Sequence, residues 1–267
     1  MPDTFFPPST EPVDPALAAE LTLPEFPRSA GYDPLWQTSN MMGPSALWLL
    51  ESIVADLDLQ PGMRVLDLGC GRALTSIFLA REFGVQVWAT DLWIAASENW
   101  TRIQQAGMEH QVFPIHAEAH DLPYADAYFD AVVSIDAYHY FGTDDLYLPY
   151  LARFLRPEGK IGIVVPGLTA EFEGNHPPTS LQPYWEYDWW TFHSPGWWQR
   201  HVERTGFVTV ERADLIPDGW RHWLIWTEIC NGLGFRPWPE GIRMLTEDAG
   251  QTIGFTRLVG RRIETES

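Results

Sequence analysis

Short hydrophobic runs alternate with amphipathic segments through the middle of the chain. The runs short and apolar enough for buried strands are residues 64–68, 85–90, 112–116, 130–135 and 160–165. Segments with apolar side chains at helical spacing are residues 44–57, 73–83, 94–106 and 144–155. Strands separated by helices of this length pair in parallel through right-handed crossovers. The pattern predicts a doubly wound α/β fold with a mostly parallel sheet.

The chain divides into three parts, and the middle part contains this pattern. Seven prolines fall in the first 30 residues, which predicts an irregular N-terminal arm over 1–30. Residues 31–166 form the predicted α/β core. Nine of the 14 tryptophans lie between Trp185 and Trp238. We therefore interpret 167–267 as an aromatic-rich cap insertion plus the closing strands of the same sheet, with helices at 195–205 and 219–230 and strands at 207–212 and 252–262.

Charge and cysteine content narrow the classes of partner. The 267 residues include 36 acidic and 17 basic side chains, a formal charge of −19, which repels phosphate backbones and anionic lipids. Two cysteines give no disulfide framework and no zinc spacing. Neither a signal-peptide pattern nor a run of eighteen apolar residues is present. We expect a cytoplasmic protein with a small-molecule substrate and without nucleic acid or membrane partners.

The strongest chemical signal follows the strand at 64–68. Gly69 and Gly71 let the backbone pass close to a ligand and offer exposed amide donors beside a helix N-terminus. Asp67 places a carboxylate at the end of this strand, and Asp91 ends the next strand, where a carboxylate binds both hydroxyls of a ribose. The pattern predicts a nucleoside-type ligand. A nicotinamide-dependent oxidoreductase uses similar features, but a third glycine is missing from this turn.

Several motifs in order resemble those of class I S-adenosylmethionine-dependent methyltransferases, specifically the small-molecule, type 11-like group. They are Asp67–Gly71, Ala89–Asp91, Ala117–Pro123 and Leu155–Lys160. The resemblance implies a seven-stranded, Rossmann-like sheet whose last strand is antiparallel. It also implies S-adenosyl-L-methionine as the cofactor and in-line attack of a small-molecule acceptor on the sulfonium methyl. A cyclopropane-type lipid-modifying transferase shares the same core, and a nucleoside sensor without catalysis is a further alternative.

The same resemblance implies a set of cofactor-binding residues. Glu118 stands where an aspartate usually binds the adenine amino group, and Ala119 would offer its backbone amide to the ring. The complete set is Asp67, Gly69, Cys70, Gly71, Asp91, Leu92, Glu118, Ala119 and Ser134.

Residues 134–140 form the end of the fourth strand and should face the methyl group. They lack the N/D-P-P-Y/F pattern of amide- or base-methylating enzymes. His139 is the leading candidate for a general base because the ordinary pKa of histidine lies near physiological pH. Asp136 is predicted to contact the substrate or the methionine ammonium. The alternatives are that His139 only binds a neighbouring loop and that Asp136 only caps one.

Aromatic residues are the candidates for a substrate pocket, since such pockets are concave and largely apolar. The candidates are Tyr32 and Trp36 as an N-terminal lid, Tyr138 and Tyr140 as walls, and Trp189 and Trp197 in the cap. Such a pocket suits an aromatic, apolar or cationic molecule. The row of Trp220, Trp223 and Trp226 at helical spacing is predicted to be core. His116, Glu118 and His120 form too weak a pattern for a metal site, so no metal is predicted.

Overall fold

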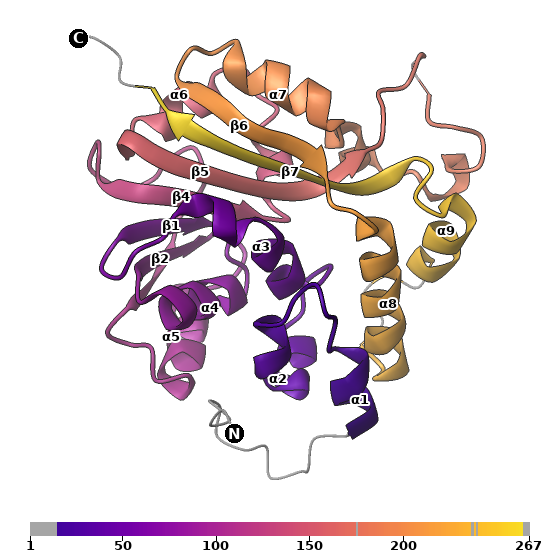
Figure 1. Cartoon of the computed structure of the whole chain (residues 1–267), viewed down its shortest axis with the longest axis horizontal. Helices are drawn as coiled ribbons and strands as arrows, with labels where there is room; N and C mark the ends of the chain where they lie inside the picture. The colour runs from indigo at the N-terminus through magenta and orange to yellow at the C-terminus, as the bar shows by residue number, and fades with distance from the viewer. Residues whose placement is uncertain (1–14, 175, 236–237, 239, 264–267) are drawn as a thin grey trace.

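Seven strands form one sheet in the computed structural model, which describes residues 15–174, 176–235, 238 and 240–263. They are β1 (Arg64–Leu68), β2 (Gln86–Asp91), β3 (Val112–His116), β4 (Phe129–Ile135), β5 (Leu155–Leu168), β6 (Val208–Leu215) and β7 (Ile253–Arg262). Their order is β3-β2-β1-β4-β5-β7-β6, and β7 runs antiparallel to both its neighbours. The predicted seven-stranded α/β sheet with an antiparallel last strand is confirmed (Figure 1).

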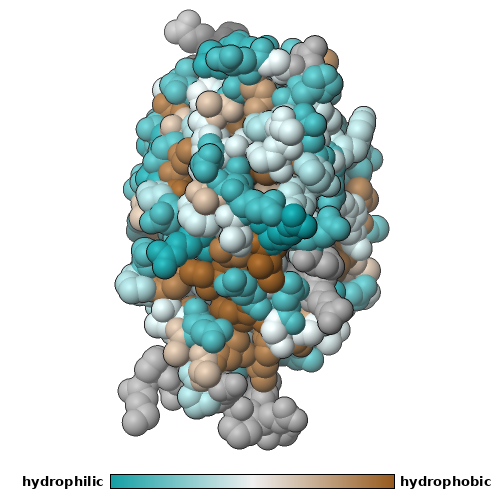
Figure 2. Space-filling view, turned by 90° about the vertical axis from the view of Figure 1, so that its right-hand side faces the viewer, coloured by the Kyte–Doolittle hydropathy of each residue, from teal (hydrophilic) through white to brown (hydrophobic). Residues whose placement is uncertain are grey.

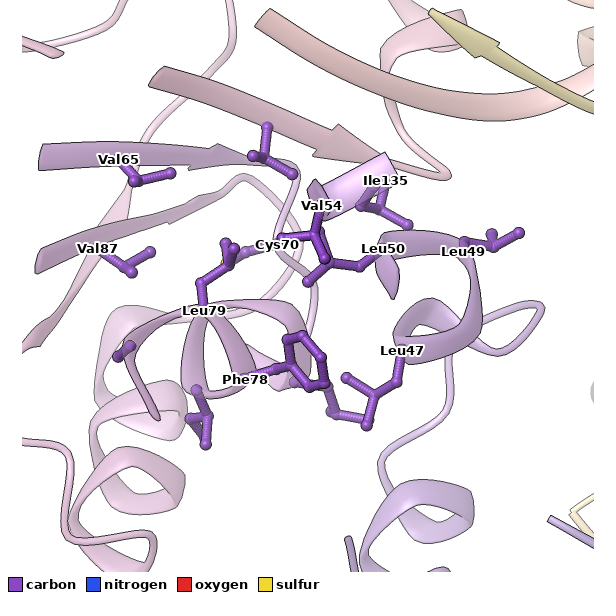
Figure 3. Close-up of a cluster of buried hydrophobic side chains, with 14 of the residues drawn as sticks. Leu47, Leu49, Leu50, Val54, Val65, Cys70, Phe78, Leu79, Val87 and Ile135 are labelled. Carbon is purple, nitrogen blue, oxygen red and sulfur yellow. The ribbon is translucent and has the colours of Figure 1, made fainter. Parts of the chain in front are cut away.

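Helices cover both faces of the sheet (Figure 1). On one face lie α3 (Ala46–Val54), α4 (Leu74–Phe83) and α5 (Ala96–Gln105), and on the other lie α6 (Tyr147–Ala152) and α7 (Pro195–Glu203). Successive strand residues point to opposite faces. Val65 therefore packs in one hydrophobic cluster and Leu66 in the other. Figure 3 shows the first cluster, where side chains of α3 and α4 meet Val65 and Val87.

The N-terminal segment is more regular than predicted. Residues 1–14 of the predicted irregular arm lie outside the described residues, but Pro15–Glu20 forms helix α1. The expectation of no regular structure was wrong there, because a proline is tolerated in the first turn of a helix. Leu17 of α1 and Leu21, which follows the helix, pack in one buried cluster with Trp48 and Trp226. A second short helix, α2 (Pro34–Ser39), follows.

Helices α8 (Gly219–Gly232) and α9 (Gly241–Asp248) are inserted between β6 and β7. Both lie near the end of the sheet where the parallel strands terminate (Figure 1). The sequence predicted α8 but not α9. Hydrophobic side chains form a patch on the side of the molecule that carries α8 (Figure 2). No helix in the described ranges is long and apolar enough to cross a bilayer.

Candidate active site

The turn between β1 and α4 is the centre of the site. Gly69 and Gly71 have positive φ angles of +73° and +52°, a conformation that favours glycine. A Cβ atom on Gly69 would lie 2.3 Å from the Cβ atom of Ala137, and one on Gly71 would lie 2.8 Å from the Met42 sulfur. Backbone conformation favours glycine at both positions. Space requires it at Gly69, because the Ala137 Cβ atom is rigid, whereas the Met42 side chain near Gly71 can move.

The amide groups of this turn are already hydrogen-bonded within the protein. The N–H groups of Gly69 and Cys70 donate to the carbonyl oxygen of Thr90, at 2.8 and 3.1 Å. The N–H of Gly71 donates to Oδ2 of Asp91 at 2.8 Å. The expectation of exposed amide donors was wrong, because the turn uses these amides to attach itself to the end of β2. What it offers a ligand is close approach to the backbone.

Asp91 is the carboxylate that anchors this arrangement. Its side chain is buried, and its Oδ1 atom accepts the N–H groups of Trp93 and Ile94 at 2.7 and 2.9 Å, in addition to the Gly71 bond at Oδ2. A carboxylate has about four acceptor positions, so three protein donors leave capacity for a ligand hydroxyl. Asp91 is held in place without being saturated.

Asp67 and Ser134 were predicted to bind the cofactor, but neither side chain lines the cavity that opens above the turn. Asp67 is fully buried and its Oδ2 accepts the hydroxyls of Thr75 and Ser76, both at 2.6 Å, while Oδ1 has no partner among the described residues. Burial raises the pKa of Asp67 to about 6 despite these two hydrogen bonds. Ser134 donates to the carbonyl of Leu68 at 2.8 Å. Both side chains point into the protein and support the turn from beneath.

A cavity of about 340 Å³ opens above the turn. Its walls bring together seven of the predicted cofactor residues: Gly69, Cys70, Gly71, Asp91, Leu92, Glu118 and Ala119. The Glu118 carboxylate accepts the backbone N–H and the ring Nδ1 of His120, at 2.9 and 2.8 Å, and these bonds lower the pKa of Glu118. Residues 40–44 and Trp226 complete the wall and were not predicted. In the sequence, only the Gly43-Pro44 pair before α3 indicates that residues 40–44 have a special role.

A second cavity of about 260 Å³ adjoins the first. Both are lined by Met42, Gly43, Pro44, Asp136 and Tyr140. The other walls of the second cavity come from the cap and from the end of β4, and they include His139, Glu186, Asp188, Trp189, Phe192, Trp223 and Trp238. Trp223 belongs to the tryptophan row that was predicted to be core. The row is thus divided, since Trp226 lines the first cavity and Trp223 the second.

Burial shifts the pKa values of Asp136 and His139 in opposite directions. Asp136 has a positive φ of +56°, and its carboxylate has no hydrogen-bond partner within the described part of the chain. Burial raises the pKa of Asp136 to about 7. The His139 side chain is only 2% exposed, its Nδ1 has no partner in the described ranges, and burial lowers its pKa to about 3. The histidine ring is therefore uncharged at neutral pH.

Tyr32 and Trp36 lie away from both cavities, so their assignment as a lid over the ligand was wrong. Tyr32 packs against Phe78 of α4, with ring centroids 5.4 Å apart, and its hydroxyl donates to Glu82 at 3.1 Å. Trp36 stacks on Tyr32 at 5.8 Å. The two rings connect α2 and the residues before it to α4.

Tyr138 and Trp197 are not pocket walls either. Tyr138 is fully buried and packs against Tyr147 and Trp198 on the opposite face of the sheet from α4. Trp197 stacks between His193 and His201, at centroid distances of 3.7 and 4.5 Å. Both rings lie in the layer of α6 and α7, where they pack with the second hydrophobic cluster.

The histidines that were considered as metal ligands are engaged in other ways. The Nε2 atom of His116 lies 2.8 Å from the carbonyl oxygen of Leu92, and His120 binds Glu118. Over the residues that the structure describes, no three His, Cys, Asp or Glu side chains come together as a metal site.

A glycine turn after the first strand, a carboxylate after the second and this strand order together define a nucleotide-binding methyltransferase-type domain. Residues 65–159 match the family model described as a methyltransferase domain. The predicted class, a class I S-adenosylmethionine-dependent methyltransferase, is thereby confirmed for this domain.

Named relatives share this domain but extend beyond it. The glycine/sarcosine/dimethylglycine N-methyltransferase of Actinopolyspora halophila is 28% identical over 167 residues, which are 62% of this chain and 29% of the relative. The methyltransferase GfsG of Streptomyces halstedii is 31% identical over 143 residues, 52% of this chain and 48% of the relative. The chain thus spans less than half the length of these two relatives.

A solved structure shares the fold. Phosphoethanolamine N-methyltransferase 2 of Haemonchus contortus, in complex with S-adenosyl-L-methionine, has a TM-score of 0.70 and 17% identity, covering 86% of this chain and 56% of that one. The likeness extends well beyond residues 65–159, so most of the cap region also belongs to the common fold.

Proposed function

We propose that the protein transfers a methyl group from S-adenosyl-L-methionine to a small-molecule acceptor. The observation that carries the proposal is the junction of the two cavities at Asp136 and Tyr140. A donor in the first cavity and an acceptor in the second would meet at this point. Holding two reactants together in this way lowers the barrier of a transfer reaction substantially. The first cavity alone falls in the ordinary size range of a small-molecule site.

The residues of the first cavity fit a nucleoside donor. Asp91 has acceptor capacity for a ribose hydroxyl, and the Glu118 carboxylate suits an amino group of the base. The glycine turn leaves room where a Cβ atom would intrude. Bound here, S-adenosyl-L-methionine supplies an electrophilic methyl group on a sulfonium. The named relatives favour this chemistry over nicotinamide-dependent oxidation and cyclopropane formation.

In this proposal, Asp136 takes up the proton whenever the methyl acceptor must lose one. A general base works best when its pKa lies near the operating pH. The pKa of Asp136, about 7, meets this condition, and its carboxylate lines both cavities. The pKa of His139, about 3, makes its ring a weak base. We therefore assign the role of general base to Asp136 and not to His139, the leading candidate from the sequence.

The donor assignment is tested by calorimetric titration of the full chain with S-adenosylhomocysteine and, separately, with NAD. We expect S-adenosylhomocysteine to bind at one site and NAD to give no binding heat. Binding of NAD without binding of S-adenosylhomocysteine would overturn the proposal. The proposal also includes a cytoplasmic location and no nucleic acid partner, since a net charge of −19 opposes phosphate binding.

A further inference from the structure

Three carboxylates line the second cavity without a basic partner. They belong to Asp136, Glu186 and Asp188, and within the described ranges no lysine or arginine lines this cavity. None of the three side chains forms an ion pair with a described residue, whereas Asp214 elsewhere on the sheet is paired with both Arg212 and Arg257. The cavity therefore concentrates negative charge that the protein neutralises at other places.

All three carboxylates influence the hydroxyl group of Tyr140. Burial raises the pKa of the Tyr140 hydroxyl to about 12, and the negative charges of Asp136, Asp188 and Glu186 contribute in the same direction. Tyr140 is 47% exposed, and it lines the second cavity together with all three carboxylates. Tyr140 lines both cavities, so this negative region faces the junction between them.

Aromatic rings form the remaining walls. Trp189 stacks on Phe192 and meets Trp238 edge to face, both at centroid distances of 5.4 Å, and Trp223 lies 5.5 Å from Trp238. The faces of such rings attract cations, most strongly where water is excluded. The same rings provide an apolar surface for the body of a ligand.

His139 is an independent sign that a ligand belongs in this cavity. Its side chain is 98% buried, lines the cavity, and has an Nδ1 atom without a partner in the described part of the chain. An unsatisfied buried polar atom is costly. A ligand N–H or O–H group in the cavity would satisfy the ring, which carries no charge that would repel a cation.

We infer that the second cavity binds the methyl acceptor as a positively charged amine, with its apolar body against the tryptophans and its ammonium group toward Asp136, Glu186 and Asp188. The inference rests on the proposed function and deepens it. An acceptor with a carboxylate or phosphate at this end would be repelled. Transfer of one ammonium proton to Asp136 gives a neutral amine with a free lone pair and a neutral carboxylic acid, which then releases the proton to water.

The test uses three probes of similar shape but different charge: phenethylamine, phenethyl alcohol and 3-phenylpropanoate. Each is titrated calorimetrically into the full chain saturated with S-adenosylhomocysteine. We expect the amine to bind about tenfold more tightly than the alcohol, and the carboxylate to bind most weakly. In Glu186→Gln and Asp188→Asn, the amine affinity should fall by about three- to tenfold while the alcohol affinity stays within about twofold.

Asp126→Asn is the matched control, because Asp126 is an exposed carboxylate that lines neither cavity. Equal binding of amine and alcohol, or equal weakening of both in the two variants, would show that the cavity selects shape and would overturn the inference. The S-adenosylhomocysteine titration reports separately on the proposed function. If that ligand does not bind, the same three probes titrated into the free protein still measure the charge preference of the second cavity.

Discussion

The two adjoining cavities are built in different ways. The first is centred on a backbone feature, a glycine turn that is tied to the end of β2 by three amide hydrogen bonds. The second is formed by side chains from segments as distant as Met42 and Trp238. A backbone-built cavity keeps its shape when most side chains change, whereas a side-chain-built cavity changes its ligand with one substitution. One architecture thus suits an invariant donor and the other a selected acceptor.

The largest expected effect concerns the backbone-built cavity. In Gly69→Ala, the new Cβ would collide with Ala137 at 2.3 Å and the residue would keep a strained positive φ. We expect a loss of about 2–4 kcal/mol in the free energy of unfolding and at least a tenfold loss of S-adenosylhomocysteine affinity. Chemical denaturation and calorimetry measure the two quantities.

Gly107→Ala separates the two contributions. Gly107 also has a positive φ, +66°, but a Cβ there meets nothing within 4 Å. This variant should lose only about 1 kcal/mol of stability and keep its ligand affinity. Equal losses in the two variants would mean that backbone strain alone, and not the contact with Ala137, explains the requirement for glycine.

The next effect concerns the carboxylate at the end of β2. Asp91→Asn keeps an oxygen for part of the backbone network but removes the charge and half of the acceptor capacity. We expect S-adenosylhomocysteine affinity to fall by about 1–3 kcal/mol, since a hydrogen bond to a charged group is lost. The Asp126→Asn variant should bind the ligand like the wild type. An Asp91→Asn variant that folds normally and binds with unchanged affinity contradicts the ribose assignment.

A smaller effect concerns the ionisation of Asp67, which supports the turn from beneath. The pKa of Asp67 rises from 3.8 to about 6 on folding, because burial disfavours the charged form. The folded state therefore holds this proton more tightly, and the stability that it contributes is present below pH 3.8 and lost as pH rises to about 6. Between pH 5 and 7 the wild type should lose about 1 kcal/mol relative to Asp67→Asn. Parallel stability profiles of the two proteins would exclude this ionisation.

The difference between the cavities also explains which residues of the site could be predicted from the sequence. The residues around Gly69 and Asp91 are contiguous with strands whose hydrophobic pattern is strong, so their place at one sheet edge followed from topology. Asp67 and Ser134 were misassigned because the two-residue period of a strand decides whether a side chain points inward or toward the ligand. No such local rule connects Met42, Asp188 and Trp238, which only the tertiary fold brings together. Aromatic composition indicated Trp189 but equally indicated Trp197, which lies elsewhere.

The smallest expected effect distinguishes the two titratable groups of the side-chain-built cavity. Ionisation of Asp136 near pH 7 adds a negative charge beside Glu186, Asp188 and Tyr140, so phenethylamine affinity should rise by about threefold between pH 6 and 8. A histidine that lost its proton near pH 6.5 would raise the affinity in the same direction, by removing a positive charge. The direction of the change therefore cannot identify the group.

Two substitutions separate these groups. Because burial lowers the pKa of His139 to about 3, its ring is already neutral at pH 6, and His139→Gln should keep the rise in affinity. Asp136→Asn should abolish it, since the carboxyl group whose pKa lies near 7 is removed. Calorimetric titrations of the three proteins at four pH values measure the profiles. The opposite outcome, a flat profile in His139→Gln and a retained rise in Asp136→Asn, would restore the histidine as the titrating group and remove Asp136 as the proton acceptor.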